Sequence, residues 1–362
     1  MTYQPGLSLR LPVPARSAFV CLDGNNCPYE PAPKVRAAVM EALSKGWMRE
    51  YPEYREVQLI ERASEFYGVP STCIAVTAGV DHALNWLMWL ASQNKAFVEH
   101  HLITYSGFID QADRYGVNLI GIPQKPFDPH LGYFHFESDF TYVANPNNPT
   151  GVLFDREEII WYLNRGKHMI VDESYMDWAE TDQSCAHMIP KNSHLIVLRG
   201  FSKAFALAGM RVGLMFANPE LIEKYKNTFD CRLIPTFTQI AVETALDNYD
   251  YVKEQIRFAR ITKENALGIL QHNGFQAIDT HTNFILIADD HATEVQAELD
   301  NRYRILTRTF SNWPGYLRVS VGSGMDMERF CYKYVEIKDK PGKVSGETVI
   351  PQTASEDVEV NR

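Results

Sequence analysis

Lys203 stands directly after Ser202 and eight residues before Arg211 in the segment RGFSKAFALAGMR. An aldehyde cofactor needs one amine to hold it, and hydroxyl and guanidinium groups can bind a phosphate that it carries. A lysine that is desolvated beside cations loses its proton more easily, and imine formation requires the neutral amine. The segment follows the apolar run LIVL, so we expect Lys203 in a buried loop at the carboxyl end of a strand. Because a serine–lysine pair alone is common on protein surfaces, further residues must support this chemistry.

Two earlier segments provide groups that suit a pyridine ring. The apolar run HMIV leads into Asp172, and a carboxylate at the end of a buried strand lies where α/β sheets bind ligands. Such a carboxylate can pair with a ring nitrogen and keep it protonated. Tyr175, three residues later, and Asn148 in the turn NPNNPTG can donate hydrogen bonds to a ring oxygen. Together with the lysine segment, these residues predict a pyridoxal 5'-phosphate site.

Each of these residues also has an ordinary structural explanation. Asp172 could cap a strand end, Asn148 could belong to a common Asn-Pro turn, and Arg211 could be a cation at a helix end. The prediction therefore depends on all of them occurring together in one chain.

Composition limits the partners of this chain. Its 362 residues are 45% hydrophobic, which is enough for a large core, and 35 basic against 45 acidic residues give a net charge of -10. This charge offers no broad field for nucleic acid or an anionic membrane. The six cysteines form no CxxC pair, which argues against a metal site, and the adjacent His100–His101 is expected in a loop or on the surface. No apolar stretch approaches a membrane span or a secretory leader, so we expect a cytoplasmic protein.

Short apolar runs alternate with amphipathic segments, which predicts an α/β fold with a mostly parallel central sheet flanked by helices. Near Pro235 the pattern changes to long helical segments followed by two short strands, which indicates a smaller α+β domain. We therefore expect a large cofactor-binding domain at 41–235 and a small domain at 236–336. Residues 1–40 are expected to pack on the small domain and the active site. The charged segment 337–362, rich in Pro, Gly, Ser and Thr, is expected to be a mobile tail.

The motifs PNNPTG, DESY, SKAFALAGMR and LRVSVG, in this order, resemble those of the fold-type-I, class I/II pyridoxal-phosphate-dependent aminotransferases. The closest pattern is that of the histidinol-phosphate aminotransferases. The resemblance extends from about Leu22 to about Arg329 and includes LDGNNCPYEPAPKV, REYPEY and TAGVDHAL. It is highly specific for fold and cofactor and less specific for substrate.

The resemblance implies roles at the cofactor. Lys203 matches the Schiff-base lysine and Asp172 the partner of the ring nitrogen, while Asn148 and Tyr175 match the residues that hold the ring oxygen. The remaining positions match residues that bind the cofactor phosphate or stack on the ring: Ser202, Arg211, the backbone amides of Gly79, Val80 and Asp81 that open a helix, and Tyr105 as the stacking aromatic.

Other matched positions concern the substrate and the partner subunit. Tyr51 matches a tyrosine that crosses to the partner's cofactor phosphate, so the resemblance implies a homodimer with composite active sites. Arg318 matches the arginine that forks onto a substrate α-carboxylate, and Arg308 matches one that meets a distal phosphate. Arg308 could equally belong to a solvated basic stretch. Asn25 and Tyr29 match amino-terminal residues close to the substrate.

The sequence also departs from the pattern. Gly200 stands where the family usually has a hydroxyl residue, so one phosphate contact is missing. Cys27 replaces an expected asparagine, His82 replaces an acidic residue, and the segment before Thr104 lacks the usual proline. These changes lie around the cofactor phosphate and the substrate entrance, and they favour altered substrate choice.

The resemblance implies ping-pong transamination between an amino donor and a 2-oxo acid such as 2-oxoglutarate, in amino-acid biosynthesis. The donor is histidinol phosphate-like, or an aromatic amino acid if aromatic side chains line the pocket; the candidates are Tyr29, Phe108, Trp178 and Trp313. The alternatives are a decarboxylase of the threonine-phosphate type or an amino-acid oxidase or cyclase on the same fold. A non-catalytic binding protein is disfavoured because every reactive residue type is present.

Overall fold

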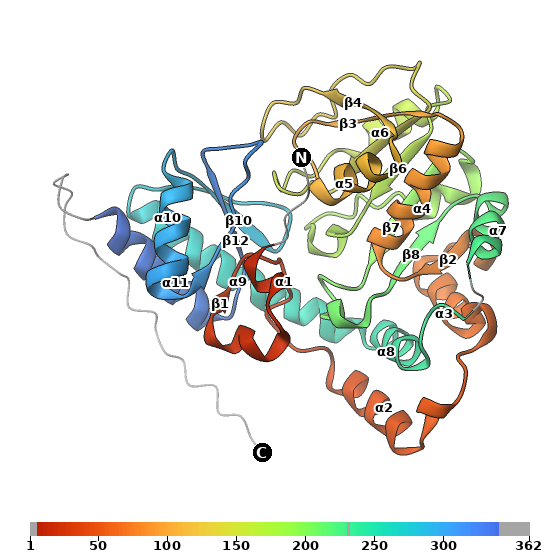
Figure 1. The fold of residues 1–362 in the computed structure, drawn as a ribbon, viewed down its shortest axis with the longest axis horizontal. Helices are drawn as coiled ribbons and strands as arrows, with labels where there is room; N and C mark the ends of the chain where they lie inside the picture. The colour runs from red at the N-terminus through yellow and green to blue at the C-terminus, as the bar shows by residue number, and fades with distance from the viewer. Residues whose placement is uncertain (1–5, 230–231, 340–362) are drawn as a thin grey trace.

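The structure is a computed structural model that describes residues 6–229 and 232–339. A seven-stranded sheet forms the centre of its larger half, on the right in Figure 1. The strands run in the order β2 (Ile74–Thr77), β8 (Gly213–Phe216), β7 (Leu195–Gly200), β6 (Met169–Asp172), β5 (Phe140–Ala144), β3 (Phe97–His101) and β4 (Asn118–Ile122). All neighbours are parallel except β8, which is antiparallel to β2 and β7. The predicted α/β fold with a mostly parallel sheet is confirmed.

Alternate residues of these strands feed two separate hydrophobic cores. Val171 and Val197 belong to one core, while Ile170 and Ile196 belong to the other. Because successive side chains of a strand point to opposite faces, the sheet is covered on both sides. The helices of this half are α3 (Val57–Tyr67), α4 (Val80–Gln93), α5 (Ser106–Tyr115), α6 (Arg156–Leu163), α7 (Pro219–Thr228) and α8 (Thr236–Asp247). The result is a three-layer arrangement with buried, apolar strands.

A second, smaller group of elements surrounds the antiparallel sheet β12–β10–β9, at the left of Figure 1. Its elements are β9 (Gln276–Ile278), β10 (Phe284–Ala288), β11 (Ile305–Leu306), β12 (Tyr316–Ser320), α10 (Ala292–Glu298) and α11 (Gly324–Lys338). The long helix α9 (Tyr249–His272) connects both parts, because Ile256 packs in a core of the large sheet and Leu270 in the core of the small one.

The domain limits stay predictions, although those at 40 and 336 fall inside α2 (Pro33–Ser44) and α11. Helix α2 packs against α8 at the base of the large part (Figure 1). Most of the expected tail, residues 340–362, lies outside the described residues. No helix in the described ranges has the length and apolar character that crossing a membrane demands.

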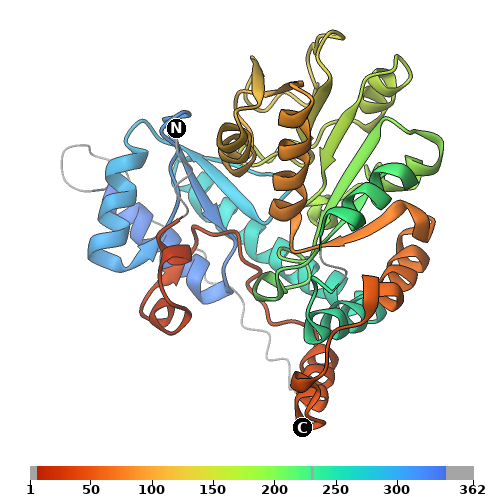
Figure 2. The same ribbon diagram turned by 45° about the vertical axis from the view of Figure 1, so that its right-hand side comes forward.

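The amino-terminal segment lies along the small part, where Figure 2 shows it beside the carboxyl-terminal elements. It contains α1 (Leu7–Arg10), the 3-10 helix η1 (Val13–Ala18) and β1 (Val20–Cys21), and β1 pairs in parallel with β11.

The expectation that His100–His101 is an exposed loop pair is wrong. Both residues lie in β3, where they are 6% and 0% exposed. His101 Nε2 contacts the carbonyl oxygen of Leu131 at 2.9 Å, and its ring packs on two phenylalanines. Burial lowers the pKa of His101 to about 4. The neutral rings therefore pack as core side chains. The prediction was wrong because it treated histidine as a polar surface residue.

Candidate active site

A cavity of about 450 Å³ opens at the carboxyl ends of β5, β6 and β7, where Ala144, Asp172 and Gly200 line it. This is the position at which α/β sheets bind ligands. Most residues predicted for the site line this cavity: Asn25, Val80, Asp81, Tyr105, Asn148, Asp172, Tyr175, Ser202, Lys203, Arg211, Arg308 and Arg318. The structure therefore brings together segments that are separated by up to 293 positions in the chain, from Asn25 to Arg318.

Three predicted residues do not line the cavity. Gly79 lies next to Arg211, which lines the cavity, and Tyr29 packs against the core of the large part. Tyr51 is 87% exposed, and the guanidinium of Arg232 lies 5.8 Å from its ring centroid. Their roles stay predictions.

The amine of Lys203 reaches from the loop after β7 toward the amino-terminal segment. Its Nζ donates a hydrogen bond to the carbonyl oxygen of Gly24 at 3.1 Å. Burial lowers the pKa of Lys203 to about 8, and the charges of Arg318 and Arg211 act in the same direction while Asp81 opposes them. About a tenth of such an amine is neutral near pH 7, far more than for an ordinary lysine.

Asp172 ends β6 and is buried. Three donors surround its carboxylate: Tyr142 Oη at 3.0 Å from Oδ2, and Ser174 N and Oγ at 3.0 and 2.6 Å from Oδ1. Burial raises the pKa of Asp172, whereas these hydrogen bonds act against the rise. Sequence reasoning missed Tyr142, because its contact depends on the register in which Ala144 lies opposite Asp172. Its one signal in the sequence is a tyrosine within the strand segment FTYVA.

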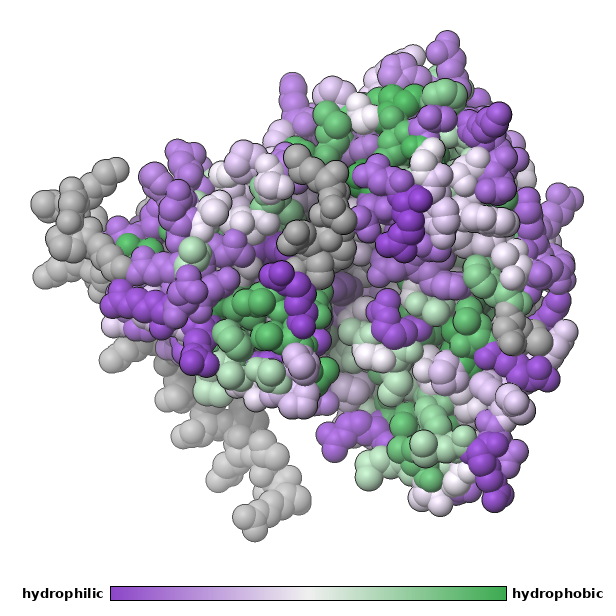
Figure 3. Space-filling model, in the orientation of Figure 1, coloured by the Kyte–Doolittle hydropathy of each residue, from purple (hydrophilic) through white to green (hydrophobic). Residues whose placement is uncertain are grey.

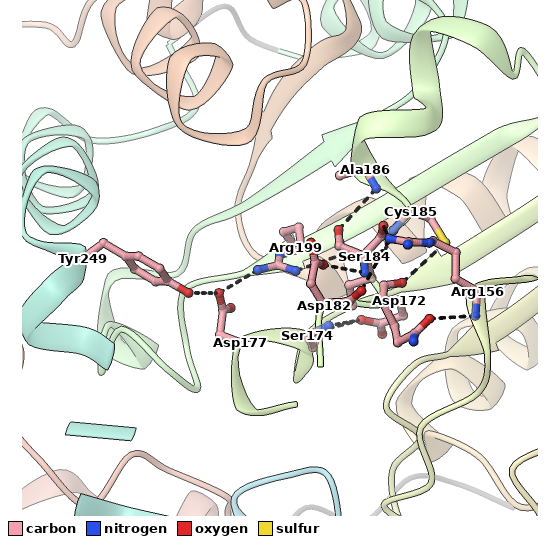
Figure 4. A network of polar contacts seen from close by, with 12 residues as sticks. Arg156, Asp172, Ser174, Asp177, Asp182, Ser184, Cys185, Ala186, Arg199 and Tyr249 are labelled. Atoms are coloured by element: carbon pink, nitrogen blue, oxygen red, sulfur yellow. Dashed lines mark hydrogen bonds and ion pairs between the residues drawn. The ribbon is translucent and has the colours of Figure 1, made fainter. Parts of the chain in front are cut away.

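A buried ion network fixes the turn that follows Asp172, as Figure 4 shows. Arg199 Nη1 donates to Glu173 Oε2 at 3.1 Å, and Arg199 Nη2 donates to Asp177 Oδ1 at 2.7 Å. All three side chains are at most 6% exposed. Because Glu173 and Asp177 flank Tyr175, the network holds the tyrosine over the cavity.

The two predicted ring-oxygen donors are held by different partners. Asn25 Nδ2 donates to Tyr175 Oη at 2.8 Å. Arg318 Nη1 donates to Asn148 Oδ1 at 2.7 Å, which leaves the Asn148 amide hydrogens for another acceptor. Arg318 Nη2 donates to the carbonyl oxygen of Asp23 at 2.8 Å. The amino-terminal segment is thus built into the site through Asp23 and Asn25.

An anion cradle lies where α4 begins. Gly79 has φ +92°, and a Cβ placed there would be 3.0 Å from Arg211 Nη2, so the backbone and this guanidinium meet closely. A Cβ on Gly213 would lie 3.0 Å from Val80 N. The first N–H groups of a helix have no carbonyl partner within it, and they favour an anion. Arg211 Nη2 also lies 3.6 Å from Asp81 Oδ2.

The donor set of this cavity fits pyridoxal phosphate. A half-buried amine of lowered pKa, a buried carboxylate and a cationic cradle at a helix amino terminus lie around one cavity. These groups suit an aldehyde, a protonated ring nitrogen and a phosphate, respectively.

Arg308 and Arg318 lie side by side at another wall. Each backbone N–H donates to the carbonyl oxygen of the other, at 3.0 and 2.7 Å, in an isolated antiparallel bridge. Residues directly opposite in such a pair present their side chains on the same face. Both guanidinium groups lie close to the ring of Phe310, at 5.8 and 5.3 Å from its centroid.

The aromatic residues considered for an aromatic donor do not line the cavity. Phe108 stacks on Tyr142 with ring centroids 3.9 Å apart, and Trp313 stacks on Tyr316. Trp178 is 3% exposed. Phe310, which sequence reasoning did not select, is the aromatic residue beside the two arginines.

Comparison with known proteins identifies the family. Residues 18–333 match the family model for class I and II aminotransferases. A histidinol-phosphate aminotransferase of Geobacter sp. (strain M21) is 30% identical over 321 residues, which cover 86% of this chain and 90% of that protein. The chain belongs to the class I and II aminotransferase family.

Solved structures share the fold. The histidinol-phosphate aminotransferase of Sinorhizobium meliloti, in complex with pyridoxal-5'-phosphate, has a TM-score of 0.80 at 21% identity and covers 88% of this chain and 90% of its own. The L-threonine-O-3-phosphate decarboxylase of Porphyromonas gingivalis has a TM-score of 0.78 at 20% identity and covers 88% and 99%. At these identities the likeness concerns the fold alone. With its family and its donor set, the chain is a pyridoxal-phosphate-dependent aminotransferase.

Lys203 should react with its cofactor at a lower pH than an ordinary lysine. Since the neutral amine is the nucleophile and its pKa is about 8, the rate at which apoenzyme takes up pyridoxal phosphate should rise with pH and level off above about 8. Arg318→Gln should move the midpoint upward, because the charge of Arg318 lowers this pKa. Stopped-flow absorbance across pH 6 to 10 measures both, with Lys203→Ala as the blank. A rate that still climbs beyond pH 9 would contradict the assignment.

Gly200→Ser should tighten cofactor binding. A Cβ at this position would meet Val80 Cγ2 at 3.4 Å and Ser174 Oγ at 3.8 Å, which are ordinary contacts, so serine fits beside the cradle. A hydroxyl bonded to a charged phosphate contributes about 1.5–3 kcal/mol, which predicts a Kd for pyridoxal phosphate lower by about tenfold or more. Equilibrium dialysis measures this Kd. Gly200→Ala adds the same Cβ without the hydroxyl, and an equal gain in that control would refute the phosphate contact.

Proposed function

We propose that this aminotransferase takes its amino group from a histidinol phosphate-like donor and passes it to a 2-oxo acid such as 2-oxoglutarate. The bridge between Arg308 and Arg318 carries the proposal, since it sets two guanidinium groups side by side in the wall of the cavity. Paired cations on one face repel each other, and an anionic substrate relieves that repulsion. The four aromatic residues considered for an aromatic amino-acid donor lie outside the cavity, and the aromatic side chain beside the paired arginines is Phe310.

The residues of the cavity divide between cofactor and substrate. Pyridoxal phosphate, when bound, supplies an aldehyde and an electron-accepting ring. In our proposal Lys203 holds the aldehyde carbon, Asp172 holds the ring nitrogen in its protonated form, and Asn148 and Tyr175 donate to the ring oxygen. Ser202, Arg211 and the amides of Gly79, Val80 and Asp81 would bind the phosphate, and Tyr105 would cover the ring.

The free Lys203 amine would be the base that removes the proton from the donor Cα. A pKa of about 8 suits this task, because the amine is partly neutral near pH 7 and can return the proton later. Arg318 binds the α-carboxylate of the 2-oxo acid, and Arg308 binds the donor phosphate. Donor and acceptor use the same cavity in turn, which gives ping-pong kinetics.

We also infer a homodimer with composite sites, located in the cytoplasm. Large exposed apolar side chains gather between residues 40 and 57, and Figure 3 shows a hydrophobic patch at the lower right, over α2. They are Met40, Leu43, Trp47, Met48, Tyr51, Tyr54 and Val57. Such a patch on a soluble surface marks an interaction site, and a second copy of the chain would cover it. Tyr51 would then reach the partner's cradle, and Asn25 and Tyr29 would lie near the substrate.

Arg308→Gln should reduce kcat/KM for L-histidinol phosphate by about 10- to 100-fold, because a charge-assisted hydrogen bond is lost. The activity with L-histidinol, which lacks the phosphate, should change little. Arg302→Gln is the matched control, since Arg302 is exposed and pairs with Glu298. Wild-type enzyme that prefers aromatic amino acids would contradict the proposed donor. Release of carbon dioxide or peroxide in place of a transferred amino group would favour the decarboxylase or oxidase alternatives.

Mixed dimers test the composite site. If Tyr51 serves the partner, a dimer of one Lys203→Ala and one Tyr51→Ala subunit contains one site with both native residues. Random mixing of the two impaired variants should then restore about a quarter of wild-type activity. Dimer exchange is followed by native mass spectrometry. Mixed dimers that form without restored activity would show that Tyr51 does not act across the interface.

A further inference from the structure

We propose that Arg16, in the amino-terminal segment, is a third cationic ligand for the distal phosphate of the amino donor, and that Leu9 and Val13 form the apolar wall beside it. This inference rests on the proposed function and deepens it. Arg16 was not selected from the sequence, and it lines the same cavity as Arg308 and Arg318.

Leu9, Val13 and Arg16 come from two short helices of the amino-terminal segment. Leu9 lies in α1, and Val13 and Arg16 lie in η1, three positions apart. Side chains three residues apart in a 3-10 helix eclipse each other, so Val13 and Arg16 face the same way. All three line the cavity, although Val13 is 71% and Leu9 is 40% exposed. Apolar side chains that face a cavity yet stay open to water are suited to cover a bound molecule.

The guanidinium of Arg16 is oriented but not neutralised. Its Nε donates to the carbonyl oxygen of Leu11 at 3.2 Å, which directs the group while both Nη atoms can still donate to an anion. In the part of the chain that the structure describes, no ion pair joins Arg16 to an acidic side chain. Two parallel N–H donors match the oxygens of a phosphate.

The local fold brings Arg16 to the wall that carries Arg308. The backbone folds back after η1, since Cys21 Sγ lies 3.7 Å from the carbonyl oxygen of Arg16. Cys21 lies opposite Leu306 in the β1–β11 pair, and Arg308 follows two residues later. This pairing joins the amino-terminal segment to the wall of the small part.

Asp23 connects the same segment to Arg318. The Asp23 carboxylate accepts the N–H of Ser8 at 2.9 Å, and its carbonyl oxygen accepts Arg318 Nη2 at 2.8 Å. Gly6 packs so closely that a Cβ there would lie 2.4 Å from Asp23 Oδ2. Because Asp23 contacts both Ser8 in α1 and Arg318, the start of the amino-terminal segment is tied to the substrate arginine.

Arg16→Gln tests the proposal, with Arg10→Gln as the matched control because Arg10 is exposed on the same segment and does not line the cavity. KM for L-histidinol phosphate should rise by about 10- to 100-fold in Arg16→Gln, while values for L-histidinol stay within about twofold. Arg16→Lys should recover part of the loss, since it keeps the charge but not the fork. The same order should appear in the Kd of L-histidinol phosphate, measured by calorimetry in a Lys203→Ala background that does not turn over.

The outcomes separate the two proposals. If wild-type enzyme does not distinguish L-histidinol phosphate from L-histidinol, the proposal for the donor is overturned, and the proposed role of Arg16 is overturned with it. If wild-type enzyme distinguishes them and Arg16→Gln does so equally well, only the role of Arg16 is overturned. An equal loss with both donors would show that Arg16 supports the fold of the segment and does not bind the phosphate.

Discussion

The buried contact of Arg199 with Glu173 and Asp177 is the constraint on which this active site depends. Burial opposes the charge of Arg199, yet Asp177 and Glu173 outweigh it and raise its pKa. Removing one partner of a buried pair costs about 3–5 kcal/mol, because the remaining charge loses its compensation. Arg199 belongs to β7 and both acids belong to the turn after β6, so the network fixes two neighbouring strand ends against each other. The first strand end carries Asp172, and the second leads to Lys203.

With the strand ends fixed, burial shifts the pKa values of Lys203 and Asp172, and neighbouring groups adjust each shift. Burial favours the neutral form of both groups, since it lowers the pKa of Lys203 and raises the pKa of Asp172. Lys203 is left with the cations Arg318 and Arg211 nearby, which favour the neutral amine that a nucleophile and base must be. Asp172 instead receives hydrogen bonds from Tyr142 and Ser174, which favour the carboxylate. Similar burial therefore yields a base and a counter-ion a short distance apart.

The sequence could predict those site residues whose position follows from their immediate neighbours in the chain. Lys203 and Asp172 each follow an apolar run that forms a buried strand, so their place at a sheet edge follows from the pattern. Tyr142 could not be found in this way, because its contact with Asp172 depends on strand register. Arg16 could not be found either, because its position depends on how the amino-terminal segment folds back. The polar residue types also led to a wrong prediction for His100–His101. The pair was expected at the surface, but both rings are buried in β3, where burial favours the neutral form. The fold class and the residues expected at the cofactor can thus be predicted from short sequence segments. The residues expected at the substrate come together only in the tertiary structure.

The distribution of charge explains how an acidic protein can select an anionic substrate. The chain has a net charge of -10, yet cations outnumber acids in its cavity, which is lined by Lys203, Arg16, Arg211, Arg308 and Arg318 and by Asp23, Asp81 and Asp172. A cleft with low-dielectric walls concentrates the field of such groups locally, so the overall charge does not determine what enters. Arg211 lies beside Gly79 at the start of α4, whereas Arg308 and Arg318 are joined by a backbone bridge in the small part, so the cations belong to separate elements. A ligand with one anionic group can pair with only one set of these cations. The cofactor phosphate together with an anionic donor would pair with both sets.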